Sequence, residues 1–222
     1  MSDETLTRLR SDLLSLADFA AQRLFTRLDG LTDEEYLWEP APGCWSVRPG
    51  PDGRSIMDGG SADPPPLTTI AWRVCHVIDL LAAERNATWL GLRPLRTPRT
   101  PRTPETLGTP RTPGTLRTLR TVRTVRDVER DGEPASAAEA QEQLRAAYQL
   151  FREHVAAAEP AALMAPMGRV AGYFARDTRT AFVLHELDEL IHHGAEIALM
   201  RDLYRALGQP FGTGAGRATS SV

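Results

Sequence analysis

One helix-periodic stretch, residues 181–204, constrains the fold of this chain more than any other feature. Its sequence is AFVLHELDELIHHGAEIALMRDLY. At about 100° per residue, its polar side chains fall on one narrow stripe with apolar residues at both ends. The stripe consists of His185, Glu189, His193 and Glu196, with His192 at its border. No arginine lies between Arg179 and Arg201, whereas a helix face in contact with water would normally carry basic residues. We therefore predict a mostly buried helix. Buried histidines and carboxylates need partners, and a bound cation is a common one.

Three further segments place apolar residues at helical spacing. Residues 3–28 form a single amphipathic stripe, and residues 68–90 follow a run of three prolines. Residues 136–158 begin with a capping box made by Ser136 and Glu139. Prolines and glycines interrupt residues 38–66, which we expect to form a loop that packs its tryptophans over one end of the helices. The fold class predicted from these segments is all-α, as a four-helix bundle.

Length and composition exclude several classes of protein. A chain of 222 residues with 41% hydrophobic side chains suits one domain, residues 1–222, with a real core. The net charge of −3 gives no general attraction to nucleic acid or to membranes. Two cysteines are too few for a disulfide framework. The amino terminus has no signal-peptide core, and no apolar run approaches the ~18 residues that span a bilayer. We therefore expect a cytoplasmic protein that does not bind membranes.

Residues 96–126 repeat a triplet based on Arg-Thr-Pro. Proline at every third position favours extended, polyproline-like conformations rather than a helix. We interpret residues 96–134 as a disordered, low-complexity insertion between the second and third helices. The alternative is a basic arm for nucleic acid, which would bind DNA in a salt-dependent way. No aromatic residue is interleaved to stack on bases, so we do not expect a nucleic-acid partner.

The candidate metal ligands come from two of the predicted helices. Glu189 and His193 are four residues apart and share a helix face, and His185 precedes Glu189 by the same step. His76, in the second helix, lies on an apolar face, where a histidine is more often a hydrogen-bonded core residue. A metal site, however, needs ligands from more than one element. Neutral imidazoles with a carboxylate suit Zn²⁺, Ni²⁺ or Fe²⁺ better than Ca²⁺ or Mg²⁺. The alternative is a polar network without metal, or a solvated helix face.

The chain resembles the DinB-like superfamily, four-helix proteins related to bacterial damage-inducible proteins and thiol-dependent transferases. That family places one metal-binding histidine on its second helix, which matches His76. Two more lie four residues apart on its last helix, in a context like HHRGQI, and aligning HHGAEI with it matches Glu189 and His193. A glutamate thus replaces one histidine, and His185 could substitute for it or join it. The resemblance covers most of the chain except the insertion and rests on LTDEEYLWEPAPGCWSV, TTIAWRVCHVIDLLAAE and LHELDELIHHGAEIALMRDLY.

The resemblance implies a thiol S-transferase or isomerase that uses mycothiol, bacillithiol or glutathione. The metal would bind the low-molecular-weight thiol and favour its thiolate form, which attacks an electrophile. Arg73 or Arg201 would bind an anionic co-substrate, and Glu196 or Asp79 would orient a ligand. Other relatives imply a metal-dependent hydrolase. A non-catalytic metal-binding or structural stress-response protein is the rival from a different class, and a homodimer is left open.

Overall fold

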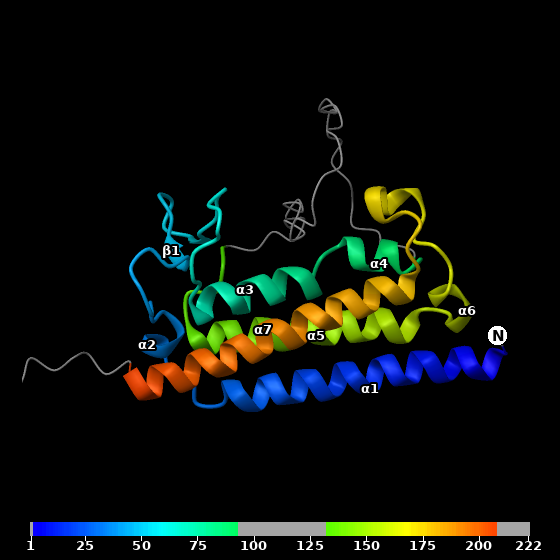
Figure 1. Ribbon diagram of the computed structural model, residues 1–222, viewed down its shortest axis with the longest axis horizontal. Helices are drawn as coiled ribbons and strands as arrows, with labels where there is room; N and C mark the ends of the chain where they lie inside the picture. Colours follow the sequence, from blue (N-terminus) through cyan, green and yellow to red (C-terminus); the bar gives the residue numbers. More distant parts are fainter. Residues whose placement is uncertain (1, 93–131, 208–222) are drawn as a thin grey trace, which may run out of the picture.

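The computed structural model describes residues 2–92 and 132–207, and this part of the chain is mostly helical (Figure 1). Its long helices are α1 (Asp3–Leu28), α3 (Ile70–Leu81), α5 (Ala137–Ala157) and α7 (Arg179–Leu207). The short elements are α2 (Asp33–Tyr36), α4 (Arg85–Trp89), α6 (Pro160–Leu163), the 3₁₀ helix η1 (Arg169–Phe174) and the strands β1 (Val47–Pro49) and β2 (Ser55–Met57). The predominance of helix confirms the all-α prediction. The insertion predicted at residues 96–134 lies almost wholly outside the described residues.

Side-chain caps explain where the long helices begin. The hydroxyls of Ser2, Thr69 and Ser136 each accept a hydrogen bond from a backbone N–H three residues further on. Thr178 caps α7 in the same way, because its hydroxyl accepts from the N–H of Ala181 at 3.1 Å. At the start of α5, the Glu139 carboxylate also accepts from the backbone N–H just before the cap. The observed bounds of α1 and α5 lie within one residue of the predicted bounds.

The four long helices share one core. α1 and α3 each pack against both α5 and α7. The buried apolar side chains of all four helices form a single cluster. In Figure 1, α7 crosses the middle of the molecule with α1 on one side and α3 on the other. α7 therefore contacts two helices, α1 and α3, that come much earlier in the chain. None of the helices within the described ranges is long and apolar enough to cross a bilayer.

The predicted second helix, residues 68–90, is two helices, so that prediction was wrong. α3 ends at Leu81, and α4 starts at Arg85. The fully buried Asn86 donates hydrogen bonds from its amide to the carbonyls of Leu80 and Leu81, at 2.8 and 3.1 Å. A side chain that occupies carbonyls at the end of a helix replaces the backbone donors of a further turn. The chain therefore bends here, and α4 leaves the axis of α3.

The proline-rich segment after α2 covers the start of α3. Its short strands β1 and β2 pair antiparallel, an element that the sequence did not predict. The Trp45 ring lies 6.0 Å from Trp72, whose indole N–H donates to the backbone carbonyl of Asp58 at 2.9 Å. Trp38 meets Tyr204, near the end of α7, edge to face at 5.6 Å. The tryptophans of this segment thus pack against one end of the helices, as the sequence predicted.

Candidate metal centre

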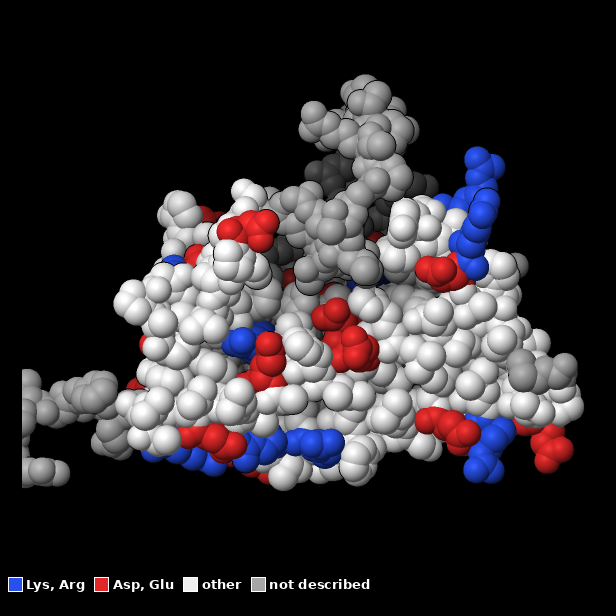
Figure 2. Space-filling view, in the orientation of Figure 1, with Lys and Arg blue, Asp and Glu red and all other residues white. Residues whose placement is uncertain are grey.

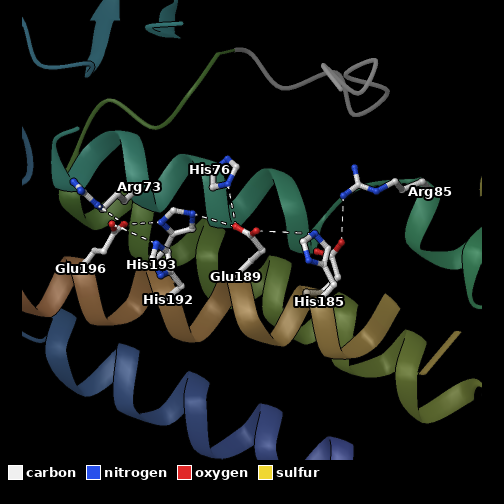
Figure 3. A network of polar contacts seen from close by, with 9 residues as sticks. Arg73, His76, Arg85, His185, Glu189, His192, His193 and Glu196 are labelled. Atoms are coloured by element: carbon white, nitrogen blue, oxygen red, sulfur yellow. Dashed lines mark hydrogen bonds and ion pairs between the residues drawn. The ribbon is translucent and has the colours of Figure 1, made fainter. Parts of the chain in front are cut away.

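A polar seam runs between α3 and α7 at the level of the candidate ligands (Figure 3). The two helices are antiparallel. Arg73 of α3 contacts Glu196 of α7, whereas His76, further along α3, contacts Glu189, which comes earlier in α7. The seam consists of Arg73, His76 and the first residue of α4, Arg85, facing Glu186, Glu189, His193 and Glu196 of α7. Figure 2 shows acidic side chains at the surface over the middle of α7. The seam is therefore buried on its inner side and reaches the surface on this face.

Three ligand atoms converge at the centre of the seam. Glu189 Oε2 lies 3.2 Å from His193 Nε2 and 3.6 Å from His76 Nε2. All three donor atoms lie within 4.8 Å of one another. The imidazole rings of His76 and His193 are nearly perpendicular, with centroids 4.8 Å apart. We call His76, Glu189 and His193 the inner triad.

The inner triad fits a divalent transition metal in both chemistry and spacing. Two imidazole nitrogens and one carboxylate oxygen form a donor set found in catalytic zinc sites. In a tetrahedral site with bonds of about 2.1 Å, two ligand atoms lie about 3.4 Å apart. The separations of 3.2 and 3.6 Å from Glu189 lie on either side of that value. Three protein ligands leave one coordination position for another molecule.

Further contacts fix how the two histidines are oriented. The Trp72 ring stacks on His76, with centroids 5.2 Å apart and planes 17° apart. On the other side, His193 Nδ1 donates to Glu196 Oε2 at 2.8 Å, and Arg73 Nε donates to the same oxygen at 2.8 Å. Hydrogen bonding of one imidazole nitrogen to a carboxylate directs the other nitrogen to a metal. His193 Nε2 is thereby aimed at Glu189.

Proton affinities in the inner triad follow from these contacts. The contacts with His193, and then with His76, hold the pKa of the Glu189 carboxyl well below its usual range. Burial opposes ionisation of Glu196, but His193 and Arg73 outweigh it and lower the pKa of Glu196 to about 2. Burial lowers the pKa of His193, but Glu189 and Glu196 raise it to about 9. Without a cation, a proton on His193 thus balances two carboxylates, and a metal would have to displace it.

His185 does not join the inner triad. Its side chain is 45% exposed, and its Nε2 is 4.0 Å from Glu189 Oε1, on the far side of the carboxylate from His193. Residues four positions apart on a helix differ by about 40° in the direction of their side chains. His185 is two such steps before His193, so its side chain is turned away from α3. Successive residues of the buried stripe of α7 are instead spaced alternately four and three positions apart, and this spacing places Glu186 in the seam. Sequence reasoning missed Glu186 and its partner Arg85, although this alternation in Phe182, Glu186, Glu189, His193, Glu196 and Met200 was a signal for it.

The two arginines proposed for anion binding are both engaged elsewhere. Arg73 is 8% exposed, and besides Glu196 it donates to the backbone carbonyl of Thr68. Arg201 is 2% exposed and pairs with both carboxylate oxygens of Glu35, at 2.7 and 2.8 Å. It also donates to the backbone carbonyl of Asp29 at 2.9 Å. The structure therefore places Arg73 beside the inner triad and Arg201 in a separate buried ion pair, and neither arrangement supports binding of a co-substrate.

A second group of donors overlaps the first. His192, His193 and Glu196, which we call the outer triad, also have donor atoms within 4.8 Å of one another. His192 Nε2 lies 3.4 Å from Glu196 Oε1, and its side chain is 62% exposed. The outer triad shares His193 with the inner triad, so the two sets compete for one imidazole.

Comparison with known proteins identifies the family. A family model described as the DinB superfamily matches residues 16–197. The chain belongs to the DinB superfamily. No curated protein and no solved structure matches it. The part of the chain that matches the DinB superfamily includes α3 and the portion of α7 that carries Glu189 and His193. The inner triad thus lies wholly within the family-like part of the chain.

Proposed function

We propose that this DinB-superfamily protein binds one divalent transition metal, Zn²⁺, Ni²⁺ or Fe²⁺, and uses it for thiol-dependent S-transfer. The observation that carries the proposal is the convergence of His76, Glu189 and His193 from two helices, with donor separations of 3.2 and 3.6 Å. The proposed setting is a DinB-type four-helix bundle in a single domain, residues 1–222, that works in the cytoplasm.

Each residue of the site has a distinct part in this proposal. A bound metal of this kind supplies the Lewis acidity that lowers the pKa of a thiol and favours its thiolate form. His76 and His193 provide neutral nitrogen donors, and Glu189 provides one negative charge. Glu196 holds the proton of His193 Nδ1, so that Nε2 carries the lone pair. The co-substrates would be a low-molecular-weight thiol of the mycothiol type and a small electrophile.

The first test is metal binding by variants of the triad. We expect protein purified without added metal, or reconstituted with Zn²⁺, to hold about one ion per chain by elemental analysis. His76→Ala and His193→Ala should each lose the ion while the helical circular dichroism signal persists. Loss of even an indirect partner of a ligand weakens binding about 10–100-fold, so loss of a direct ligand should exceed that. His185→Ala is the matched control, because it removes a neighbouring histidine outside the triad and should keep the ion.

Thiol chemistry is tested on the metal-loaded protein. Transfer from a low-molecular-weight thiol to an electrophile should depend on the ion and disappear in His76→Ala. One ion per chain without thiol turnover would instead favour a metal-dependent hydrolase or a non-catalytic metal protein. Wild-type protein that holds no metal after reconstitution would overturn the proposal and leave the seam as a structural network.

A further inference from the structure

We propose that Arg73 decides which of the two overlapping triads holds the ion, by keeping Glu196 out of metal coordination. This inference rests on the proposed function, because it concerns the same ion. Arg73 would be a positioning residue, since its contacts are to Glu196 and to the backbone of Thr68 rather than to a metal ligand of the inner triad.

Donor chemistry alone does not choose between the triads. Each offers two imidazole nitrogens and one carboxylate oxygen within the same 4.8 Å limit. Each also needs His193, the inner triad through the Nε2 that faces Glu189 and the outer triad through the Nδ1 that faces Glu196. Because one neutral imidazole has a single nitrogen lone pair, the protonated nitrogen of His193 determines which triad is complete.

Two contacts of Glu196, one with Arg73 and one with His193, favour the inner triad. The Arg73 guanidinium is held by α3 and donates to Glu196 Oε2 at 2.8 Å, so this carboxylate is already paired with a buried positive charge. A metal ion in the outer triad would lie next to that charge, and like charges at such separations repel strongly where water is partly excluded. Glu196 Oε2 also accepts from His193 Nδ1 at 2.8 Å, which keeps the proton on this nitrogen. The lone pair is then on Nε2, in the inner triad.

The seam provides a matched control at its other end. Arg85 pairs with Glu186 at 3.2 Å, as Arg73 pairs with Glu196 at 2.8 Å. Both pairs join α7 to the α3–α4 side of the molecule, and both involve a largely buried arginine side chain. Among the described residues, only the Arg73 pair contacts a histidine of either triad. Arg85→Met therefore removes a similar interhelical pair and should not change which triad binds the ion.

The experiment is a Co²⁺ titration followed by visible absorption, with stoichiometry from elemental analysis, on a double-mutant cycle between Arg73 and His192. In the wild-type background, His192→Ala should leave the cobalt spectrum unchanged and the affinity within about twofold. Arg73→Met should still bind one ion, but with a mixed spectrum and an affinity about 10–100-fold weaker. In that background, His192→Ala should restore a single wild-type-like spectrum, because the outer triad loses a ligand. Arg85→Met should show the wild-type spectrum.

Two results would overturn the inference while the proposed function stands. One is an Arg73→Met protein with the wild-type spectrum and affinity, and the other is an effect of His192→Ala that is equal in both backgrounds. If Arg73→Met does not fold, Arg73→Lys and Glu196→Gln decide the question. The lysine variant should keep the wild-type spectrum, and the glutamine variant should bind at the inner triad alone with no response to His192→Ala. Wild-type protein that binds no Co²⁺ would overturn both proposals at once.

Discussion

At the scale of single residues, two carboxylates three positions apart on α7 behave in opposite ways. Glu189 contacts two imidazoles, which hold its pKa low. Glu186 is 1% exposed, and burial raises its pKa to about 7 in spite of Arg85. One of its oxygens contacts Arg85 at 3.2 Å, and the other has no hydrogen-bond partner among the described residues. The state of each carboxyl is thus determined by its neighbours and not by its residue type.

The raised pKa of Glu186 predicts how stability changes with pH. Between about 4.5 and 7, the folded protein keeps a proton on Glu186 that the unfolded chain has lost. The free energy of unfolding should therefore fall as the pH rises through this range, by up to about 3 kcal/mol, and this contribution should level off above pH 7. Urea unfolding at pH 5 and pH 7.5, with chelator present, should show this fall in wild type and a smaller one in Glu186→Gln. Equal falls in the two proteins would contradict the assignment.

At the scale of elements, the sequence predicted α1, α5 and α7 to within a few residues because caps and the 3.6-residue period are local signals. It did not predict the register of α7, where the seam contains Glu186 and turns His185 outward. The register depends on which side of α7 packs against α3, and the sequence of one helix alone does not determine this. The break after Leu81 was missed for a similar reason, since Asn86 caps carbonyls only once α4 has turned back. The sequence was enough to single out His76, Glu189 and His193 as residues that could lie together, whereas the pairing of the arginines required the tertiary structure.

The buried pair between Arg201 and Glu35 connects three elements, and it carries a prediction at this scale. Arg201 of α7 reaches Glu35 of α2 and the backbone carbonyls of Arg27 and Asp29 at the end of α1. Arg201→Met leaves the Glu35 charge buried and unpaired, so we expect a loss of about 3–5 kcal/mol in the free energy of unfolding. The double variant with Glu35→Leu should recover part of the loss.

A surface pair is the control for the buried one. Arg8 pairs with Asp12 on the exposed side of α1, so Arg8→Met should lower the free energy of unfolding by less than about 1 kcal/mol. Denaturant unfolding of all variants tests both statements. Equal losses in Arg8→Met and Arg201→Met would show that Arg201 contributes no more than an exposed salt bridge does.

At the scale of the whole molecule, the inner triad connects α3 with α7, and α7 in turn packs against α1. A ligand that binds only the folded chain stabilises it by about 2.7 kcal/mol at a free concentration of 100 times Kd. For a chain of this size we expect saturating Zn²⁺ to raise Tm by roughly 5–10 °C, and a chelator to reverse the rise. His193→Ala should have the same Tm with and without Zn²⁺. A wild-type Tm that changes with neither Zn²⁺ nor chelator would contradict this expectation.

The position of α7 in the chain has a consequence for how the protein is made. Among the described helices it is translated last, so a nascent chain carries His76 long before Glu189 and His193 exist. At ordinary rates of synthesis, the interval is on the order of ten seconds. α3 lacks this partner helix for about the same interval, and α1, which is made earlier, lacks it for longer. Under the proposed function, the ion can therefore enter only after translation has passed α7, and its identity depends on which metals the cell supplies to the newly finished protein.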